Sequence, residues 1–175
     1  MDFKTQRRFR KANEALFFNP TVGADHLMVI RGYENLTFAV KTHNIGVLKN
    51  DETVEYSTTH GVKTGRDGYI QTYNDLAISF TEDDRDIVQN LLDDIKLSGK
   101  NNHLEVAFFK GKKLEDAHFL GIIENGIIAQ GDPIEGDSEN TTTPSAIQVQ
   151  LKGHWYPVSA GAKPDEFLNA VKGLM

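Results

Sequence analysis

Residues 75–95 read DLAISFTEDDRDIVQNLLDDI, and this stretch contains both kinds of secondary structure that the chain uses. In its first part Leu76, Ile78 and Phe80 alternate with smaller residues, which is the period of a strand with one buried face. In its second part the apolar residues follow the spacing of one helical stripe, and they are Ile87, Val88, Leu91, Leu92 and Ile95. The sequence therefore predicts a strand that leads directly into an amphipathic helix on the outside of a sheet.

Both ends of this helix carry terminal signals. Thr81 is expected to cap the free amides at the start, with Asp84 three residues later in the position of a capping box. The acidic residues between Thr81 and Ile87 lie near the positive end of the helix dipole. Gly99 is a typical stop signal. We expect the helix to span residues 81–98.

Further apolar alternation predicts short antiparallel strands. Residues 26–30 and 36–40 flank a polar turn and predict a hairpin. Residues 118–123 and 127–130 flank Glu124-Asn125-Gly126, and Asn-Gly between two apolar runs predicts a second hairpin. The other expected strands are residues 104–108 and 147–152. This order favours a mainly β (α+β) fold, an antiparallel sandwich or barrel-like domain with one amphipathic helix outside it.

Residues 43–70 are a long polar stretch with glycines at positions 46, 61, 65 and 68. A long β-hairpin is one interpretation, and an irregular loop is the other. Loops of this length in a compact domain are uncommon and are often functional. We therefore treat this stretch as a candidate functional element.

The two ends of the chain differ from its middle. Residues 1–20 carry five basic residues against two acids, a net charge of +3, whereas the rest of the chain carries −9. We expect residues 1–19 to be a basic helical arm, residues 20–157 a single β domain, and residues 158–175 a tail with a short helix. The arm residues that we assign to a subunit interface are Arg7, Arg8, Arg10 and Lys11, which could pair with an acidic face of a neighbour. A solvated amphipathic helix is the alternative interpretation of the same residues.

Composition excludes several classes of protein. With 175 residues, of which 39% are hydrophobic and 25% charged, the chain is expected to fold around its own core. It contains no cysteine, which excludes disulfides and thiolate metal sites. No apolar run approaches the ~20 residues that a membrane-spanning helix needs. We expect neither membrane insertion nor a secretory signal.

No motif predicts an active site. The six histidines do not share a metal-binding spacing. The segment GVKTGRDG at 61–68 departs from a phosphate-binding loop, because its lysine precedes the second glycine. The paired acids Asp83-Asp84 and Asp93-Asp94 point about 100° apart on a helix and do not converge on one substrate. We predict no catalytic residue, no metal ligand and no cofactor, and so not an enzyme.

The whole pattern resembles the tail tube proteins of contractile phages and the related ring-forming tube proteins of bacterial secretion machines. The resemblance covers residues 20–157 and depends on the extension at 43–70, the junction DLAISFTEDDRDIVQNLLDDI and the closing strand that ends near Trp155 and Tyr156. It implies a barrel-like subunit that forms six-membered rings. In such rings the inner sheets join around a channel, and the long loop stacks onto the next ring.

The resemblance also implies roles for particular residues and partners. It assigns inter-ring stacking to Val47, Leu48, Val54, Tyr56, Val62 and Tyr69, and interface contacts to Trp155 and Tyr156. It implies copies of the chain, tail sheath, baseplate and tape-measure proteins as partners, with DNA passing through the lumen, and a virion protein made in the bacterial host cytoplasm. The polar Gln148 and Gln150 would line water inside the wide barrel. A baseplate tube initiator and a β-barrel module that binds a small ligand or sugar remain alternatives.

Overall fold

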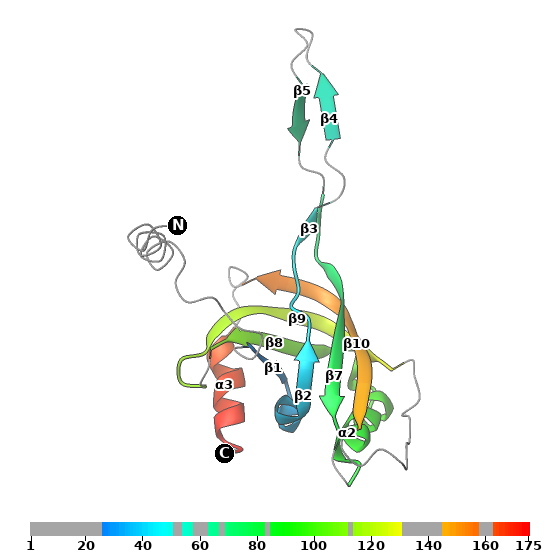
Figure 1. Ribbon diagram of the computed structural model, residues 1–175, viewed down its shortest axis with the longest axis vertical. Helices are drawn as coiled ribbons and strands as arrows, with labels where there is room; N and C mark the ends of the chain where they lie inside the picture. The colour runs from blue at the N-terminus through cyan, green and yellow to red at the C-terminus, as the bar shows by residue number, and fades with distance from the viewer. Residues whose placement is uncertain are drawn as a thin grey trace, which may run out of the picture.

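The computed structural model describes residues 26–50, 54–57, 63–66, 69–82, 85–111, 114–130, 145–157 and 163–175. Its centre is a six-stranded antiparallel sheet that curves into a nearly closed barrel (Figure 1). Across the sheet the strands are β1 (His26–Ile30), β8 (Leu104–Lys110), β9 (His118–Ala129), β10 (Ala146–Pro157), β7 (Tyr73–Thr81) and β2 (Val40–His43). The predicted fold class, mainly β with a barrel-like sheet, is confirmed.

The junction between β7 and helix α2 (Ile87–Leu97) confirms the order of elements but moves the start of the helix. Thr81 remains in the strand, paired with Ala146, so its predicted role as the cap is wrong. The chain turns through Asp86, which adopts a left-handed conformation with φ 53°. The carboxylate of Glu82 accepts hydrogen bonds from the N–H groups of Val88 and Gln89, at 2.9 and 2.8 Å, and satisfies amides at the start of the helix.

The inner face of the sheet and one face of α2 form the larger hydrophobic core. Val88, Leu92 and Ile95 of the helix are buried together with Leu76, Ile78 and Phe80 of β7. The alternation and the helical stripe predicted for this stretch therefore meet in one core. After α2 a short 3-10 helix, η3 (Lys100–Asn102), leads into β8.

A second core lies on the outer face of the sheet, beneath helix α3 (Pro164–Lys172). The predicted C-terminal helix is confirmed, and it packs on the domain rather than extending from it (Figure 1). The guanidinium of Arg31 links the sheet to α3, since it contacts Glu105 of β8 at 2.9 Å and Glu166 of α3 at 3.0 Å. This second core consists of Val29, Ala107, Phe109, Phe119 and Ile122 from the sheet and Phe167, Leu168 and Val171 from α3.

The predicted hairpin between residues 26–30 and 36–40 is wrong. Residues Glu34–Ala39 form a 3-10 helix, η2, and β1 pairs with β8 instead. Leu36 is 1% exposed and Phe38 is 59% exposed, so these two residues do not share a buried face. A 3-10 helix has three residues per turn, which places residues two apart on different sides.

The second predicted hairpin, at Asn125-Gly126, is also wrong, because β9 continues through these residues. They form a bulge. Lys152 pairs with Ile127 and His154 with Glu124, so two residues of β9 oppose one residue of β10. Asn125 takes a left-handed conformation, φ 51°, and a side chain on Gly126 would meet the Leu104 carbonyl oxygen at 3.1 Å. Both features are typical of a bulge as well as of a tight turn.

The long stretch between β2 and β7 is a projecting hairpin, which agrees with the first of its two interpretations. Its base is β3 (Lys49–Asn50) paired with β6 (Ile70–Gln71), and farther out β4 (Val54–Ser57) pairs with β5 (Lys63–Arg66). Figure 1 shows this hairpin extending along the longest axis, away from the barrel. The predicted N-terminal arm and Val62 lie outside the described residues, and the proposed domain boundaries stay predictions.

Candidate assembly surfaces

The first candidate surface lies at the root of the hairpin. Five large apolar side chains there are substantially exposed, and we call them the root patch: Val47, Leu48, Tyr69, Ile70 and Tyr73. Val47 and Leu48 immediately precede β3, Tyr69 immediately precedes β6, Ile70 is the first residue of β6, and Tyr73 is the first residue of β7. Strands β3 and β6 are paired with each other. Apolar side chains grouped at one exposed site mark a contact surface more often than single ones do.

The sequence assigned Val47, Leu48 and Tyr69 to an inter-ring contact, and the structure brings these three to the root patch. It adds Ile70 and Tyr73, which sequence reasoning missed. The signal for Tyr73 was the alternation of β7 itself, since Tyr73 occupies the outward position that precedes Asp75 and Ala77. Val54 and Tyr56 lie on β4, farther out along the hairpin. The stacking role of all these residues stays a prediction.

The second candidate surface is the outer face of β7 and β10. Its residues form three cross-strand pairs, Gln148 with Ser79, Gln150 with Ala77 and Lys152 with Asp75, and we call these six residues the polar face. Gln148 donates to the Ser79 hydroxyl at 3.1 Å, and the Lys152 ammonium lies 3.6 Å from the Asp75 carboxylate. One acid and one base cancel, so this face is polar without a net charge. Gln148 and Gln150 lie on one exposed face, as predicted.

The outer face of the sheet is therefore divided in two. Over β1, β8 and the first half of β9 it is apolar and covered by α3. Over β7 and β10 it is polar, and Ala77, Gln148 and Gln150 are exposed. The half of the face that α3 does not cover is exposed to solvent. It is available to contact a neighbouring chain or to line a water-filled channel.

The two predicted interface aromatics lie in different environments. Trp155 is a core residue, 4% exposed, with its ring edge-on to Phe108 at 5.5 Å between centroids. Its neighbour Tyr156 is partly buried and packs against the second core, near α3. Trp155 thus packs inside its own domain, and the interface role of the pair stays a prediction.

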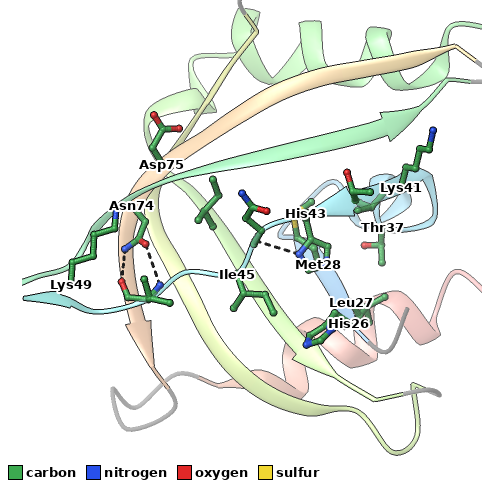
Figure 2. A pocket seen from close by; sticks show the side chains of 15 residues that line it. His26, Leu27, Met28, Thr37, Lys41, His43, Ile45, Lys49, Asn74 and Asp75 are labelled. Carbon is green, nitrogen blue, oxygen red and sulfur yellow. Dashed lines mark hydrogen bonds between the residues drawn. The ribbon is translucent and has the colours of Figure 1, made fainter. Parts of the chain in front are cut away.

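A groove of about 860 Å³ lies where the barrel is not closed, between β1 and β2 (Figure 2). The ring of His43 occupies this seam, 6.4 Å from the ring of His26 and 5.5 Å from that of Phe108, measured between centroids. Burial lowers the pKa of His43 below its usual value of 6.5, and the nearby His26 lowers it further, while hydrogen bonds to backbone groups of Asn44 and His26 oppose the shift. The seam therefore favours the neutral form of the His43 ring.

The groove holds few groups that could bind a metal ion or take part in a reaction. Nowhere in the described part of the chain do three or more His, Asp or Glu side chains gather closely enough to hold a metal ion. The Thr37 hydroxyl is buried without a hydrogen-bond partner in the groove wall. The rest of the lining combines apolar side chains with the polar Thr42, Asn44 and Asn74 and with the charged Lys41, Lys49 and Asp75. Among the described helices, none has the length and apolar character to cross a membrane.

Comparisons with known proteins give a result at the level of structure. No protein-family model and no curated protein sequence matches the chain. The cap that terminates the tube of the anti-feeding prophage superposes with a TM-score of 0.57, covering 79% of this chain and 92% of the cap, at 12% identity. The sheath/tube terminator of the extracellular contractile injection system PVC, in its extended state, has a TM-score of 0.58, covering 80% of this chain and 97% of that one, at 11% identity.

A chain of the PVC sheath–tube complex, also in the extended state, has a TM-score of 0.55, covering 84% of this chain and 97% of that one, at 13% identity. At such identities the likeness concerns the fold. It nevertheless spans nearly the whole of each neighbour, so the shared unit is the complete domain of those proteins. The resemblance to the contractile tail tube family is thereby confirmed in three dimensions, and this chain has the fold of the tube-capping and sheath–tube chains of contractile injection systems.

Proposed function

We propose that this chain is a structural subunit of a contractile tail or injection tube, which assembles with copies of itself into stacked six-membered rings around a channel. The observation that carries the proposal is the projecting hairpin with the root patch exposed at its base (Figure 1). A hairpin that extends away from its own domain can bury its apolar side chains only against a second subunit. Tyr69 and Ile70 then become buried, which contributes favourable free energy to stacking.

In this assembly the polar face lines the channel. Its amide and hydroxyl groups are satisfied by one another or by water, and its single acid–base pair is neutral overall. A neutral polar lining neither binds nor strongly repels a charged polymer, because attraction to phosphates requires unpaired Lys or Arg. The chain as a whole has a net charge of −6, which further disfavours adhesion of DNA. DNA or another cargo passes through without sequence-specific contacts.

The role is non-catalytic, and its partners are copies of the chain together with sheath, baseplate and tape-measure proteins of a tail-like particle. A second candidate is a protein that ends the tube rather than extends it. Two of the three solved neighbours described above are a cap and a terminator, with TM-scores of 0.57 and 0.58, and these values are close to the 0.55 of the sheath–tube chain. The baseplate initiator remains a variant of the same proposal.

Mass measurement and microscopy test the proposal. Light scattering coupled to size-exclusion chromatography, followed by negative-stain imaging, is expected to reveal rings at high protein concentration and stacked tubes for a tube subunit. Single rings that do not stack indicate the cap. A monomer at every concentration, which also fails to join preformed tubes of a related system, contradicts assembly as the function.

The root patch provides a sharper test. Replacing Tyr69 and Ile70 with serine is expected to abolish stacking while the fold remains, because both side chains are exposed in the subunit. Leu97 on α2 is a matched control, since it is 87% exposed and Tyr69 is 86% exposed. Leu97→Ser should assemble like the parent. Equal assembly of both variants would mean that the root patch is not the contact.

A further inference from the structure

The two chain segments that enter and leave the hairpin are tied together by one buried side chain. Asn74 lies on β7 and is 2% exposed. Its Oδ1 accepts the Val47 N–H at 3.1 Å, and its Nδ2 donates to the carbonyl oxygens of Val47 at 2.9 Å and Thr72 at 2.8 Å. Figure 2 shows the Asn74 amide turned toward the segment between Ile45 and Lys49, with the paired bonds dashed. The amide of Asn74 thus makes two hydrogen bonds to Val47 on the segment that enters the hairpin. It makes a third to Thr72 on the segment that leaves it.

A third strand joins the same point through Trp155 of β10. Its backbone N–H donates to the Thr72 carbonyl oxygen at 2.8 Å, so that oxygen accepts from both Asn74 and Trp155. The indole packs closely against Gly46 on the incoming segment and against Gly121 on β9, and a side chain at either glycine would overlap the ring. The ring is itself fixed by its edge-to-face contact with Phe108.

The hairpin's own ladder does not explain a fixed direction. At the base it consists of two residue pairs, Lys49 with Gln71 and Asn50 with Ile70. An isolated two-stranded ribbon is marginal in water even when it is longer than this. Hydrogen bonds made by a side chain as buried as Asn74 are more persistent, since water competes less for them. The group formed by Asn74, Trp155 and the carbonyl of Thr72 is therefore the stiff part of the root.

We propose that Asn74 and Trp155 are positioning residues, which form a mount that fixes the direction of the hairpin before the subunit meets a neighbour. The proposal rests on the proposed function only in its consequence for assembly. A hairpin that is already oriented loses less conformational freedom when it docks, and docking is correspondingly tighter.

A second asparagine in the domain makes the same pair of hydrogen bonds to one backbone residue, and it supplies the matched control. Asn101 donates from Nδ2 to the Ile128 carbonyl oxygen at 3.0 Å and accepts the Ile128 N–H at 2.8 Å. This pair of bonds repeats the one between Asn74 and Val47, but it joins η3 to β9 and not to the hairpin. Asn101→Ala therefore removes a comparable pair of hydrogen bonds without touching the root.

The absence of cysteine makes the direction measurable. Cysteines introduced at Glu55 on β4 and Gln150 on the polar face carry nitroxide labels, and pulsed electron paramagnetic resonance reports the distance between them in dilute, unassembled protein. The parent and Asn101→Ala are expected to give one narrow distance distribution, and Asn74→Ala a broad one. A narrow distribution in Asn74→Ala overturns the mount. Should Asn74→Ala fail to fold, Gly46→Ala displaces the indole instead and is read in the same way.

Assembly of the unlabelled variants tests the consequence separately. Asn74→Ala should need a higher protein concentration to stack than Asn101→Ala does. If Asn74→Ala has a broad distribution yet assembles like the parent, the inferred link to assembly is overturned while the mount stands. If the parent itself never assembles, the proposed function fails, and the resonance measurement still decides whether the mount exists.

Discussion

The indole of Trp155 packs directly on the backbone of Gly46, in the segment that leads from β2 into the projecting hairpin. A methyl group at position 46 has no room there, because it would overlap the ring. We predict that Gly46→Ala lowers the free energy of unfolding by about 1–3 kcal/mol, the usual cost of forcing an extra group into a packed site. Urea unfolding measures the change. Gly173→Ala serves as the control, since a side chain there meets its nearest atoms at an ordinary 3.5 Å.

Helix α2 gives a prediction about the core. Leu92 is fully buried and Leu97 in the same helix is 87% exposed. Leu92→Ala should destabilise the domain by about 2–5 kcal/mol, because it removes apolar contacts and leaves a cavity. Leu97→Ala should change stability by no more than about 0.5 kcal/mol. Thermal or urea unfolding of the pair compares them, and equal losses would mean that α2 does not pack on the sheet through the Leu92 face.

The start of α2 allows the two possible caps to be separated. Glu82 accepts the N–H groups of Val88 and Gln89, whereas Thr81 lies in β7. Glu82→Ala is expected to cost about 1 kcal/mol, in the range of lost helix caps. Thr81→Val removes the hydroxyl, keeps the branched shape that suits a strand, and should cost less. The opposite order in urea unfolding would restore Thr81 as the cap.

His43 makes stability depend on pH in a defined direction. Since burial lowers its pKa below 6.5, the unfolded chain binds a proton at this residue more readily than the folded one does. The stabilisation from the neutral ring is present above pH 6.5 and is lost as the pH falls below that value.

His43→Gln tests this prediction, because the variant cannot titrate at position 43 while other groups remain. Between about pH 7.5 and pH 5.5 the parent should lose more stability than His43→Gln does. The difference between the two slopes isolates this histidine from the carboxylates that titrate in both proteins. Parallel slopes would show that the folded and unfolded states bind protons alike at His43.

The elements that were predictable from sequence are those whose pattern follows from one buried face. Leu76, Ile78 and Phe80 alternate because β7 faces the core on one side, and the stripe of α2 has the same origin. In both elements the local pattern and the tertiary environment favour the same structure. The stretch at 43–70 was predictable only as a choice between a long hairpin and an irregular loop, because its length and glycines suit either.

The failures have a physical cause as well. Residues 36–40 alternate like a strand, yet Leu36 enters the core from a 3-10 helix and Phe38 points to solvent. Asn125-Gly126 allows a left-handed residue, which a hairpin turn and a bulge both require, so local sequence does not distinguish them.

The mount at the hairpin root was not visible in the sequence. Asn74 acts on Val47, 27 positions earlier, and an asparagine in a strand has no local signature for such a contact. Trp155 had a signal, since an isolated tryptophan at a strand end is conspicuous. That signal did not tell a residue packed on Gly46 from one that faces a neighbouring subunit.

The division of the outer sheet face bears on how this chain changes over evolutionary time. Under α3, a substitution such as Ile122 to a polar residue damages the subunit itself, so folding constrains that half of the face. At Ala77 or Gln150, which are exposed, a substitution leaves the core untouched, and selection acts there through whatever contacts the sheet from outside. Two rates of divergence should therefore be found on a single sheet, one determined by the stability of the subunit and the other by what touches the sheet from outside.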